Sequence, residues 1–352
     1  MLTWQTLVIL SVSWWLAAVV TWWCVPRVIA WYRHYHWDRP HHGKRQNIKD
    51  THQGIVPRGG GVAIMIGILA AALVLLSWDW QLVAIIVGSM ILTVVGWLDD
   101  VYDLSPLARL IVNILVAVMI VAAGMTIDFV TNPLGSGVLT LTFWPWLPPV
   151  LTVFYIVALT NITNWAKGID GQMPGTVAMA AMWIGVLALR LTARVNQTAI
   201  LSLIVAGSFS GFLYWNFYPQ KIMPGYGGGS LAGFLLSVLS IMAGTKVATL
   251  FMVLALPIAD ALFTILRRTI AGKSIFLGDR GHLHHKLLDR LHWGRRRIAV
   301  FYWGVSLLMG VLAQVLPTWG KIVAFFLVTV GVFAFLIWAK ISANPSILPT
   351  KR

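Results

Sequence analysis

Three carboxylates fall within five residues at the end of an almost unbroken apolar run, at Asp99, Asp100 and Asp103. Ionisable groups at membrane depth are costly and usually functional. A shared helical turn would place Asp99 and Asp103 on one face of a helix. Their mutual repulsion favours a bound cation, and a metal ion that bridges phosphate oxygens is the natural guest. The cluster therefore predicts phosphate chemistry at a membrane surface. A solvated helix end is the weaker alternative, because negative charge is unfavourable at a helix C-terminus.

A second polar segment contains two asparagines three residues apart, Asn161 and Asn164, followed by Lys167 and by Gly-Ile-Asp170-Gly. Asparagine carbonyl oxygens can bind metal ions, and the amide groups can bind phosphate or sugar oxygens. The pattern indicates a helix that breaks into a binding loop. An asparagine-rich turn would be a credible alternative if the segment stood alone.

Two glycine-rich segments open apolar helices. The first is Pro57-Arg58 followed by three glycines. Exposed N–H groups beside a helix N-terminus favour a bound phosphate, but a junction of small residues for close packing is an equally good interpretation. The second segment runs from Pro224 through Tyr226 to Ser230 and is only a weak phosphate-loop signal by itself.

A histidine-rich segment contains Arg280, His282, His284 and His285 in a chain dominated by apolar residues. Imidazoles, protonated or neutral, can bind diphosphate oxygens, and arginine suits a diphosphate well. A zinc site is less favoured because no Cys or Glu nearby completes a ligand set.

The segments around these histidines carry further signals. Residues 283–291 predict an amphipathic helix on the anionic inner leaflet, because leucines fall on one face with basic residues around them. Asp260 lies in an apolar helix shortly before two arginines. It is either a buried carboxylate paired with arginine or a residue with a direct role.

The composition predicts the environment of these motifs. Apolar residues make up 59% of the 352 residues and charged residues 11%, whereas a soluble protein has roughly 45–50% and roughly 25%. A membrane-spanning helix needs about 20 mostly apolar residues. We therefore expect an all-α, polytopic membrane protein with about eleven transmembrane helices. The expected spans lie near residues 3–25, 60–77, 80–98, 107–125, 147–161, 174–191, 197–215, 229–245, 247–266, 298–316 and 321–339.

The net charge of +15 follows this topology. With these spans, 22 of the 26 Lys and Arg residues fall on one side of the membrane. The positive-inside rule makes that side cytoplasmic. We expect a multi-pass protein of the inner or plasma membrane, with its N-terminus outside, its C-terminus in the cytoplasm and its active site on the cytoplasmic face. The distribution argues against nucleic acid as a partner, and the single cysteine, Cys24, supports no disulfide, redox or zinc role.

These motifs, in this order, resemble the polyprenyl-phosphate N-acetylhexosamine-1-phosphate transferase superfamily, glycosyltransferase family 4, over essentially the whole chain. The matching residues are His52 with Pro57-Arg58-x-Gly60, Asp99-Asp100-x-x-Asp103-Leu-Ser, Asn161-x-x-Asn164-x-x-x-Gly-Ile-Asp170-Gly, Pro257-Ile-x-Asp260 with Arg267-Arg268, and Asp279-Arg-x-His282-x-His284-His285. Each motif alone is moderately specific, but five in order are highly specific. The lack of a pentapeptide-type histidine motif favours the branch that transfers GlcNAc.

The resemblance implies a single integral-membrane transferase domain over residues 1–352. It implies that N-acetylhexosamine 1-phosphate passes from a UDP-sugar to polyprenyl (undecaprenyl) phosphate with release of UMP, which initiates a cell-envelope glycan. Mg²⁺ is the expected cofactor, with Mn²⁺ as the alternative. The expected partners are a UDP-N-acetylhexosamine, a polyprenyl phosphate and membrane lipid, with a second copy of the chain as a further candidate. The inner loops would be 26–59, 99–106, 161–173, 216–228 and 267–297.

The resemblance also implies roles for individual residues. The catalytic set is Asp99, Asp100, His282, His284 and His285. The substrate-binding set is His52, Arg58, Asn161, Asn164, Asp170, Asp260 and Arg280. The metal ligands would be Asp99, Asp100, Asp103 and Asn164. Asp99 would deprotonate or orient the prenyl phosphate, or act as the nucleophile of a two-step reaction, and the sequence leaves these roles open.

Three positions depart from the family pattern. Lys167 stands where the family usually has Asp, Gln172 where it has Leu, and Tyr226 where a metal-binding Asp is expected. A phenol is a poor Mg²⁺ ligand, and two negative charges are missing from a site expected to hold a dication. These departures favour, as the alternative, a degenerate relative that binds nucleotide sugar or lipid phosphate without efficient turnover. An aspartate-rich membrane prenyltransferase is less favoured because there is only one acidic motif. A transporter is least favoured because the unusual residues gather at one face.

Overall fold

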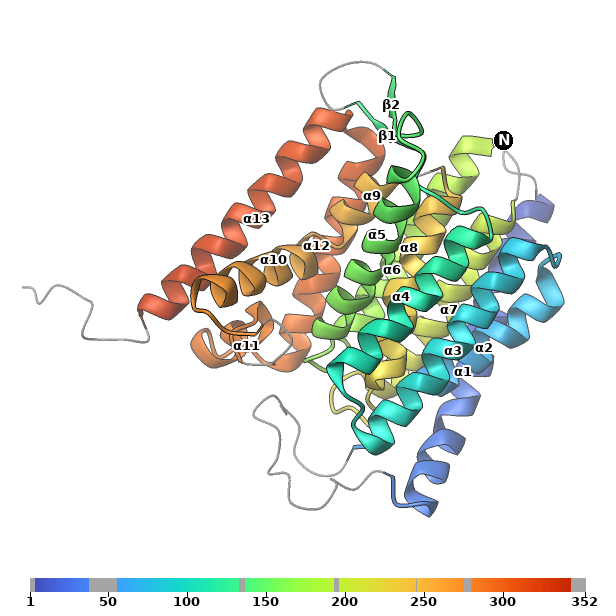
Figure 1. The fold of residues 1–352 in the computed structure, drawn as a ribbon. Coiled ribbons are helices and arrows are strands. Elements are labelled where there is room, and N and C mark those ends of the chain that lie inside the picture. Colours follow the sequence, from blue (N-terminus) through green and yellow to red (C-terminus); the bar gives the residue numbers. More distant parts are fainter. Residues whose placement is uncertain are drawn as a thin grey trace, which may run out of the picture.

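The computed structural model describes residues 4–37, 56–132, 137–192, 196–244, 246–274 and 280–342, and these are almost entirely helical (Figure 1). The helices are α1 (Trp4–His34), α2 (Gly60–Leu75), α3 (Trp80–Tyr102), α4 (Pro106–Ala122), α5 (Leu147–Trp165), α6 (Gln172–Thr192), α7 (Gln197–Asn216), α8 (Gly225–Met242), α9 (Val247–Val253), α10 (Ala255–Ile270), α11 (Leu283–Arg290), α12 (Arg295–Val315) and α13 (Thr318–Ile341). Between α4 and α5, β1 (Phe129–Thr131) pairs antiparallel with β2 (Val138–Thr140).

Each of the eleven apolar segments is helical, and the all-α membrane class is confirmed. Within the described ranges, eight helices are long and apolar enough to cross a membrane, while α2 and α4 are shorter. The expectation of one continuous span over residues 247–266 is wrong, because α9 and α10 meet at an angle of 85°. Pro257 lies just after the break, and its ring nitrogen has no hydrogen for a helical bond to the preceding turn.

Helix α8 forms the centre of the larger group of helices, which contains α1 to α8. Of its 18 residues, 94% are buried. It packs against α2, α3, α5 and α6. A Cβ on Gly96 of α3 would clash with the backbone of Gly227, and one on Gly61 of α2 would clash with Gly228. The glycines that follow Pro224 therefore let α8 approach its neighbours closely. They are helical and buried, so the expectation that residues 225–228 belong to an inner loop is wrong.

The helices α10 to α13 form a second group beside the first (Figure 1). The predicted amphipathic helix is present as α11, but its buried residues Leu283 and Leu287 belong to the same hydrophobic cluster as Ile298 and Tyr302 of α12. The apolar face of α11 therefore packs against protein instead of lying on the bilayer surface. This packing fixes the histidine segment to the second group.

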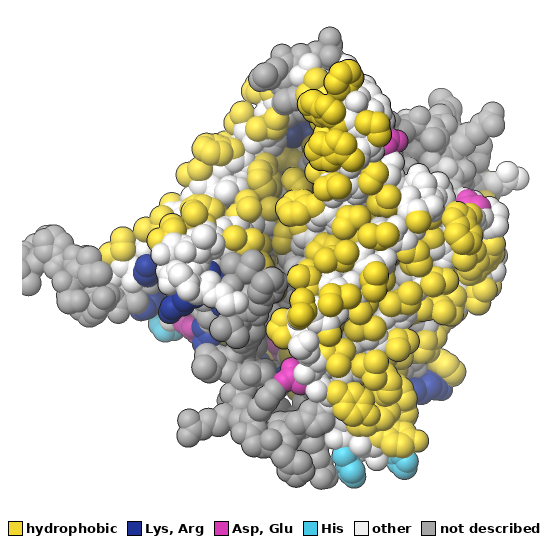
Figure 2. Space-filling model, in the orientation of Figure 1, with side chains coloured by type: hydrophobic (Ala, Val, Ile, Leu, Met, Phe, Trp, Pro, Cys, Tyr) yellow, Lys and Arg dark blue, Asp and Glu magenta, His cyan; other side chains and the backbone are white. Residues whose placement is uncertain are grey.

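Several predicted loops are shorter than expected, so much of the polar machinery lies on rigid helix ends. The helices α1, α3, α5 and α8 extend into those loops over residues 26–34, 99–102, 161–165 and 225–228. Figure 2 shows hydrophobic side chains over most of the drawn face, as a protein surrounded by lipid requires. The basic side chains visible in this view gather mainly near α11.

Candidate active site

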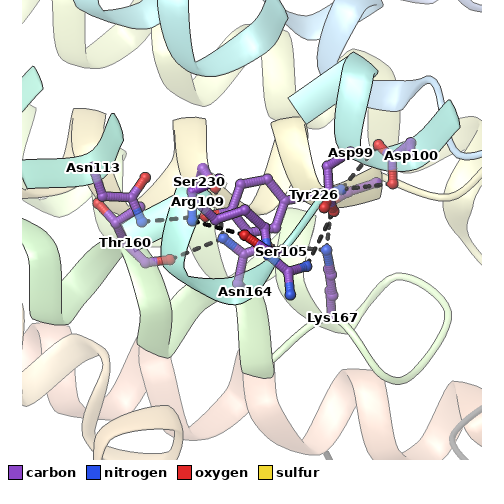
Figure 3. Close-up of polar contacts among 12 residues, drawn as sticks. Asp99, Asp100, Ser105, Arg109, Asn113, Thr160, Asn164, Lys167, Tyr226 and Ser230 are labelled. Carbon is purple, nitrogen blue, oxygen red and sulfur yellow. Dashed lines mark hydrogen bonds and ion pairs between the residues drawn. The ribbon is translucent and has the colours of Figure 1, made fainter. Parts of the chain in front are cut away.

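Four helix termini meet at the polar cluster shown in Figure 3: the end of α3, the start of α4, the end of α5 and the start of α8. We call it the acidic cluster, and it contains Asp99, Asp100, Arg109, Asn164, Lys167 and Tyr226. Helix ends carry unpaired backbone groups and partial charges, which suits them to binding charged ligands.

The corner between α3 and α4 brings Arg109 back onto Asp99. Asp103 ends α3 in the left-handed conformation with φ of 55°. Ser105 then caps α4 by accepting a hydrogen bond from the Ala108 N–H at 3.2 Å. Arg109, in the first turn of α4, lies with its Nη1 3.2 Å from Asp99 Oδ2. Asp103 follows Asp99 by one helical turn and donates its backbone N–H to the Asp99 carbonyl at 2.8 Å; the Asp103 side chain is exposed, whereas that of Asp99 is 9% exposed.

The two neighbouring aspartates at the end of α3, both half-buried, are bound differently. Asp99 Oδ1 is buried and has no hydrogen-bond partner among the described residues. Both oxygens of Asp100 accept from the Tyr226 backbone N–H at 3.0 Å, so Asp100 binds the positive end of α8. Gly225, with φ of +72°, makes this approach feasible, because a Cβ there would clash with Asp100 Oδ2 and the Arg58 carbonyl.

Lys167 lies inside this cluster. Its Nζ donates to Asn164 Oδ1 at 2.9 Å and to the Gly225 carbonyl at 2.7 Å. Asn164 Nδ2 in turn donates to Ser230 Oγ at 2.7 Å and to a backbone carbonyl of α5. Burial lowers the pKa of Lys167 from its usual value, and the carboxylates of Asp100 and Asp99 oppose that shift.

The predicted metal ligands do not assemble into a donor set. In the described part of the chain, no three His, Cys, Asp or Glu side chains are grouped so that they could hold a metal ion. Asn164 Oδ1 accepts from the Lys167 ammonium, and Asp103 is an exposed C-cap of α3. The residues therefore do not fit the Mg²⁺ site implied by the resemblance, and binding of Mg²⁺ or Mn²⁺ stays a prediction.

A second cluster, the histidine cluster, contains Asp260, His282, His284 and His285. Asp260, on α10, lies with Oδ2 2.9 Å from His282 Nδ1 and accepts from the Leu283 N–H at 2.8 Å. The rings of His282 and His284 are parallel with centroids 5.6 Å apart, and His285 follows at 4.4 Å from His284. Asp260 therefore holds the start of α11 and orients the first histidine.

Burial keeps the other two imidazoles neutral. His284 and His285 are 1% and 2% exposed. Burial lowers the pKa of His284 well below its usual value and that of His285 to about 4, and the charge of Arg280 adds to the second shift. The Nδ1 atoms of both have no hydrogen-bond partner in the described ranges. These rings are therefore neutral hydrogen-bonding groups near pH 7.

The two clusters share one segment, residues 165–170. Lys167 belongs to the acidic cluster, while a Cβ on Gly168 would clash with the His284 ring. The Trp165 ring lies 6.3 Å from the His282 ring. The structure therefore brings together sequence motifs more than a hundred residues apart.

Three other predicted site residues make contacts outside the two clusters or at the rim of the histidine cluster. Asp170 is 1% exposed and accepts from the Gln220 N–H at 3.2 Å, with Arg295 at 3.9 Å. Asn161 donates to a carbonyl of its own helix at 2.8 Å. Arg280 pairs with Asp289 at 2.9 Å near the surface.

Two further residues belong to the first inner segment. Arg58 is half-buried and interacts electrostatically with Asp100. His52 lies outside the described residues.

Arg109 is the main residue of the cluster that no motif indicates. Its only signal is an arginine in the first turn of an apolar helix, where the helix dipole disfavours a cation unless an anion is close. Ser230 and the Tyr226 backbone N–H are likewise contributed by the fold, because both meet residues more than sixty positions away.

The comparisons with known proteins show the family of this chain. The glycosyl transferase family 4 model matches residues 82–244. A Bacillus subtilis protein, named "probable undecaprenyl-phosphate N-acetylglucosaminyl 1-phosphate transferase", is 36% identical over 247 residues, 68% of each chain. This chain belongs to glycosyl transferase family 4.

Two other members of the family extend the comparison. A decaprenyl-phosphate N-acetylglucosaminephosphotransferase of Mycobacterium leprae is 30% identical over 291 residues, 74% of this chain and 73% of the relative. A phospho-N-acetylmuramoyl-pentapeptide-transferase of Bacillus licheniformis is 25% identical over 277 residues, 75% of this chain and 84% of the relative. The family 4 chain described here is thus a multi-pass membrane enzyme of the phosphoglycosyl transferase class.

Proposed function

We propose that this family 4 member transfers N-acetylhexosamine 1-phosphate from a UDP-sugar to polyprenyl phosphate and releases UMP. The names of the relatives support a polyprenyl-phosphate acceptor and an amino-sugar phosphate donor. The observation that carries the proposal is Asp99: one oxygen is paired with Arg109, and the other is buried with no hydrogen-bond partner among the described residues. A carboxylate so placed can accept a proton from an incoming phosphate.

In the one-step version, an oxygen of the acceptor phosphate attacks the phosphorus that carries the sugar. A new P–O bond joins lipid phosphate and sugar phosphate, and the P–O bond to the nucleotide breaks with its electron pair leaving on UMP. Asp99 takes the proton of the acceptor phosphate or orients it, and Arg109 and Lys167 stabilise the charge on the phosphate oxygens. In the two-step version, the Asp99 carboxylate is itself the first nucleophile.

The histidine cluster serves the diphosphate of the donor. His282 is oriented by Asp260, and the neutral rings of His284 and His285 can donate hydrogen bonds without an added charge. Hydrogen bonds of this kind stabilise charge as it moves from donor to acceptor. Asp170 and Asn161 remain the proposed contacts of the nucleotide sugar.

The acceptor lipid has an apolar surface available beside the site. On α10, Leu262, Leu266 and Ile270 are 44%, 50% and 78% exposed at a spacing of four residues. Such a stripe suits a prenyl chain, and it belongs to the same helix that carries Asp260. The excess of basic residues on this side of the chain supports a cytoplasmic site, an outer N-terminus and a cytoplasmic C-terminus.

The test uses the full chain in lipid nanodiscs with undecaprenyl phosphate and, separately, UDP-GlcNAc and UDP-GalNAc. We expect UMP and a lipid-linked diphosphate sugar in equal amounts with one of the two donors. Absence of UMP release with both donors contradicts the proposal.

A second candidate is a binding protein without turnover, and one observation favours it. Lys167 occupies the interior of the cluster at a position where the family usually has Asp, and Tyr226 stands where the resemblance implies a metal-binding Asp. Retained UDP-sugar binding without UMP release would support this candidate.

A further inference from the structure

The acidic cluster carries its own cations. We propose that the Lys167 ammonium, together with the Arg109 guanidinium, takes the place of a divalent metal ion, so that this chain binds the phosphates of its substrates without one. The inference rests on the proposed function for the identity of those phosphates. It follows from the failure of the described residues to assemble a metal donor set.

Neutral oxygen atoms surround the Lys167 ammonium. Its Nζ donates to the side-chain amide oxygen of Asn164 at 2.9 Å and to the backbone carbonyl oxygen of Gly225 at 2.7 Å. These are the neutral oxygen ligands that a hard cation takes in proteins. The carboxylates of Asp100 and Asp99 add attraction from the other elements of the cluster. The ammonium therefore contacts the kind of oxygens that a metal ion would use.

Lys167 and Arg109 keep N–H donors that the described contacts do not use. An ammonium group has three N–H donors, and Lys167 uses two of them in the described part of the chain. One N–H is left for a phosphate oxygen. The Arg109 guanidinium, 25% exposed and paired with Asp99 through Nη1, offers further donors.

The aromatic ring of Tyr226 lies beside both cations. The ring lies 5.2 Å from the Arg109 guanidinium carbon and 5.5 Å from Lys167 Nζ, so both cations are within reach of its π face. Its hydroxyl accepts from Asn113 Nδ2 at 3.2 Å, which fixes the ring among the cluster residues. The aromatic ring supports the two cations and supplies no carboxylate oxygen to a metal.

The charged side chains of the acidic cluster balance one another. Asp99, Asp100 and Asp103 bring three carboxylates to the cluster, and Lys167, Arg109 and Arg58 bring three cationic groups that interact with them. A divalent ion added to these groups would meet fixed cations at close range with no net negative charge to hold it. A substrate phosphate, in contrast, adds the negative charge that the cations attract.

The primary test titrates the full chain in nanodiscs with Mn²⁺ alone and measures bound metal by electron paramagnetic resonance. We expect no stoichiometric Mn²⁺ site in the unmodified protein. We expect the double variant Lys167→Asp/Tyr226→Asp to gain one site, with an affinity at least tenfold higher. The control is Lys340→Asp, which makes the same lysine-to-aspartate change at an exposed residue of α13 and should bind Mn²⁺ as the unmodified protein does. One Mn²⁺ per unmodified chain, lost in Asp99→Asn, overturns the inference.

The second measurement compares UMP release in EDTA and in Mg²⁺. We expect rates within twofold of each other for the unmodified protein, and a loss of tenfold or more in EDTA for Lys167→Gln that Mg²⁺ partly restores. Lys167→Arg should keep most of the EDTA rate because it keeps the charge. A rate that EDTA abolishes in the unmodified protein overturns the inference. If the unmodified protein releases no UMP under either condition, the proposed function fails, and the Mn²⁺ titration alone decides the inference.

Discussion

The acidic cluster and the histidine cluster both contact residues 165–170, but they treat buried charge in opposite ways. In the acidic cluster, carboxyl groups face lysine and arginine side chains, with Asp99 paired to Arg109 at 3.2 Å. In the histidine cluster, burial holds His284 and His285 neutral, and the Asp260 carboxylate orients His282. The difference indicates a division of labour: the first cluster provides charge for a phosphate that must react, and the second provides hydrogen bonds that do not need to change protonation.

The largest expected effect tests the reactive side of this comparison. Asp99→Asn removes the charge and the proton-accepting ability of the buried carboxylate while keeping its shape, and we expect UMP release to fall by about 10³-fold or more, since general-base and charge effects both contribute. A radiolabelled or coupled UMP assay measures it. Asp128→Asn, an exposed residue beside the β-hairpin, is the matched control and should keep its full rate. An undiminished rate in Asp99→Asn would remove this residue from the mechanism.

The next effect tests the orienting role of Asp260. Asp260→Ala leaves His282 Nδ1 and the Leu283 N–H without their carboxylate acceptor. A hydrogen bond to a charged group contributes about 1.5–3 kcal/mol, so we expect roughly 10- to 100-fold slower UMP release together with a lower melting temperature. Asp260→Asn keeps an acceptor for the Leu283 N–H and should be milder. Equal losses in the two variants would show that Asp260 acts by its charge alone.

The third prediction concerns acid stability of the histidine cluster. The folded pKa of His285 is about 4 because of burial first and of Arg280 and His282 next, with Asp289 and Asp260 opposing. The unfolded chain binds this proton near pH 6.5, so the free energy of unfolding is highest above pH 6.5 and falls as the pH decreases towards 4. Between pH 7 and pH 5 the loss is about 2 kcal/mol.

Thermal unfolding in detergent micelles, followed by tryptophan fluorescence, measures this dependence. His285→Gln does not titrate in that range and should show a flatter decrease of melting temperature with falling pH. Parallel pH curves for the two proteins would show that His285 is not the group responsible.

The smallest effect concerns the corner that joins the charges of the acidic cluster. Ser105→Ala removes the cap of α4, which costs about 0.5–1 kcal/mol of stability. Because Arg109 follows in the first turn, UMP release should fall a few-fold, while the histidine cluster should keep its pH dependence. Ser105→Asp preserves the cap and should restore stability. A rate loss without a stability loss would separate Arg109 placement from capping.

Much of the fold was predictable because lipid imposes simple rules on sequence. Runs of about 20 apolar residues must be helical in a bilayer, where each backbone group needs an internal partner. All eleven such segments are helices. The break between α9 and α10 was not predicted, because hydropathy does not report a bend and Pro257 lies within an unbroken apolar run.

The membership of the site was only partly predictable. Asp99, Asp100 and Asn164 stand out because polar residues are rare in this composition, and the structure places them together. Arg109 and Ser230 do not stand out, since their proximity depends on how α4 and α8 pack. The glycine run after Pro224 was ambiguous because glycine serves both phosphate binding and close helix packing, and the contacts of Gly227 with Gly96 show the second.

The sequence by itself determined the membrane class, the family and the residue types of the two clusters, because hydropathy and motif order are properties of the chain. Only the tertiary structure decided how the charges are matched. In the sequence, Lys167 stands where the family usually has an aspartate. In the structure, the packing of α5 against α8 places its ammonium between Asn164 and the Gly225 carbonyl. Pairing of charges depends on distance and burial, and these are set by helices that the sequence separates widely.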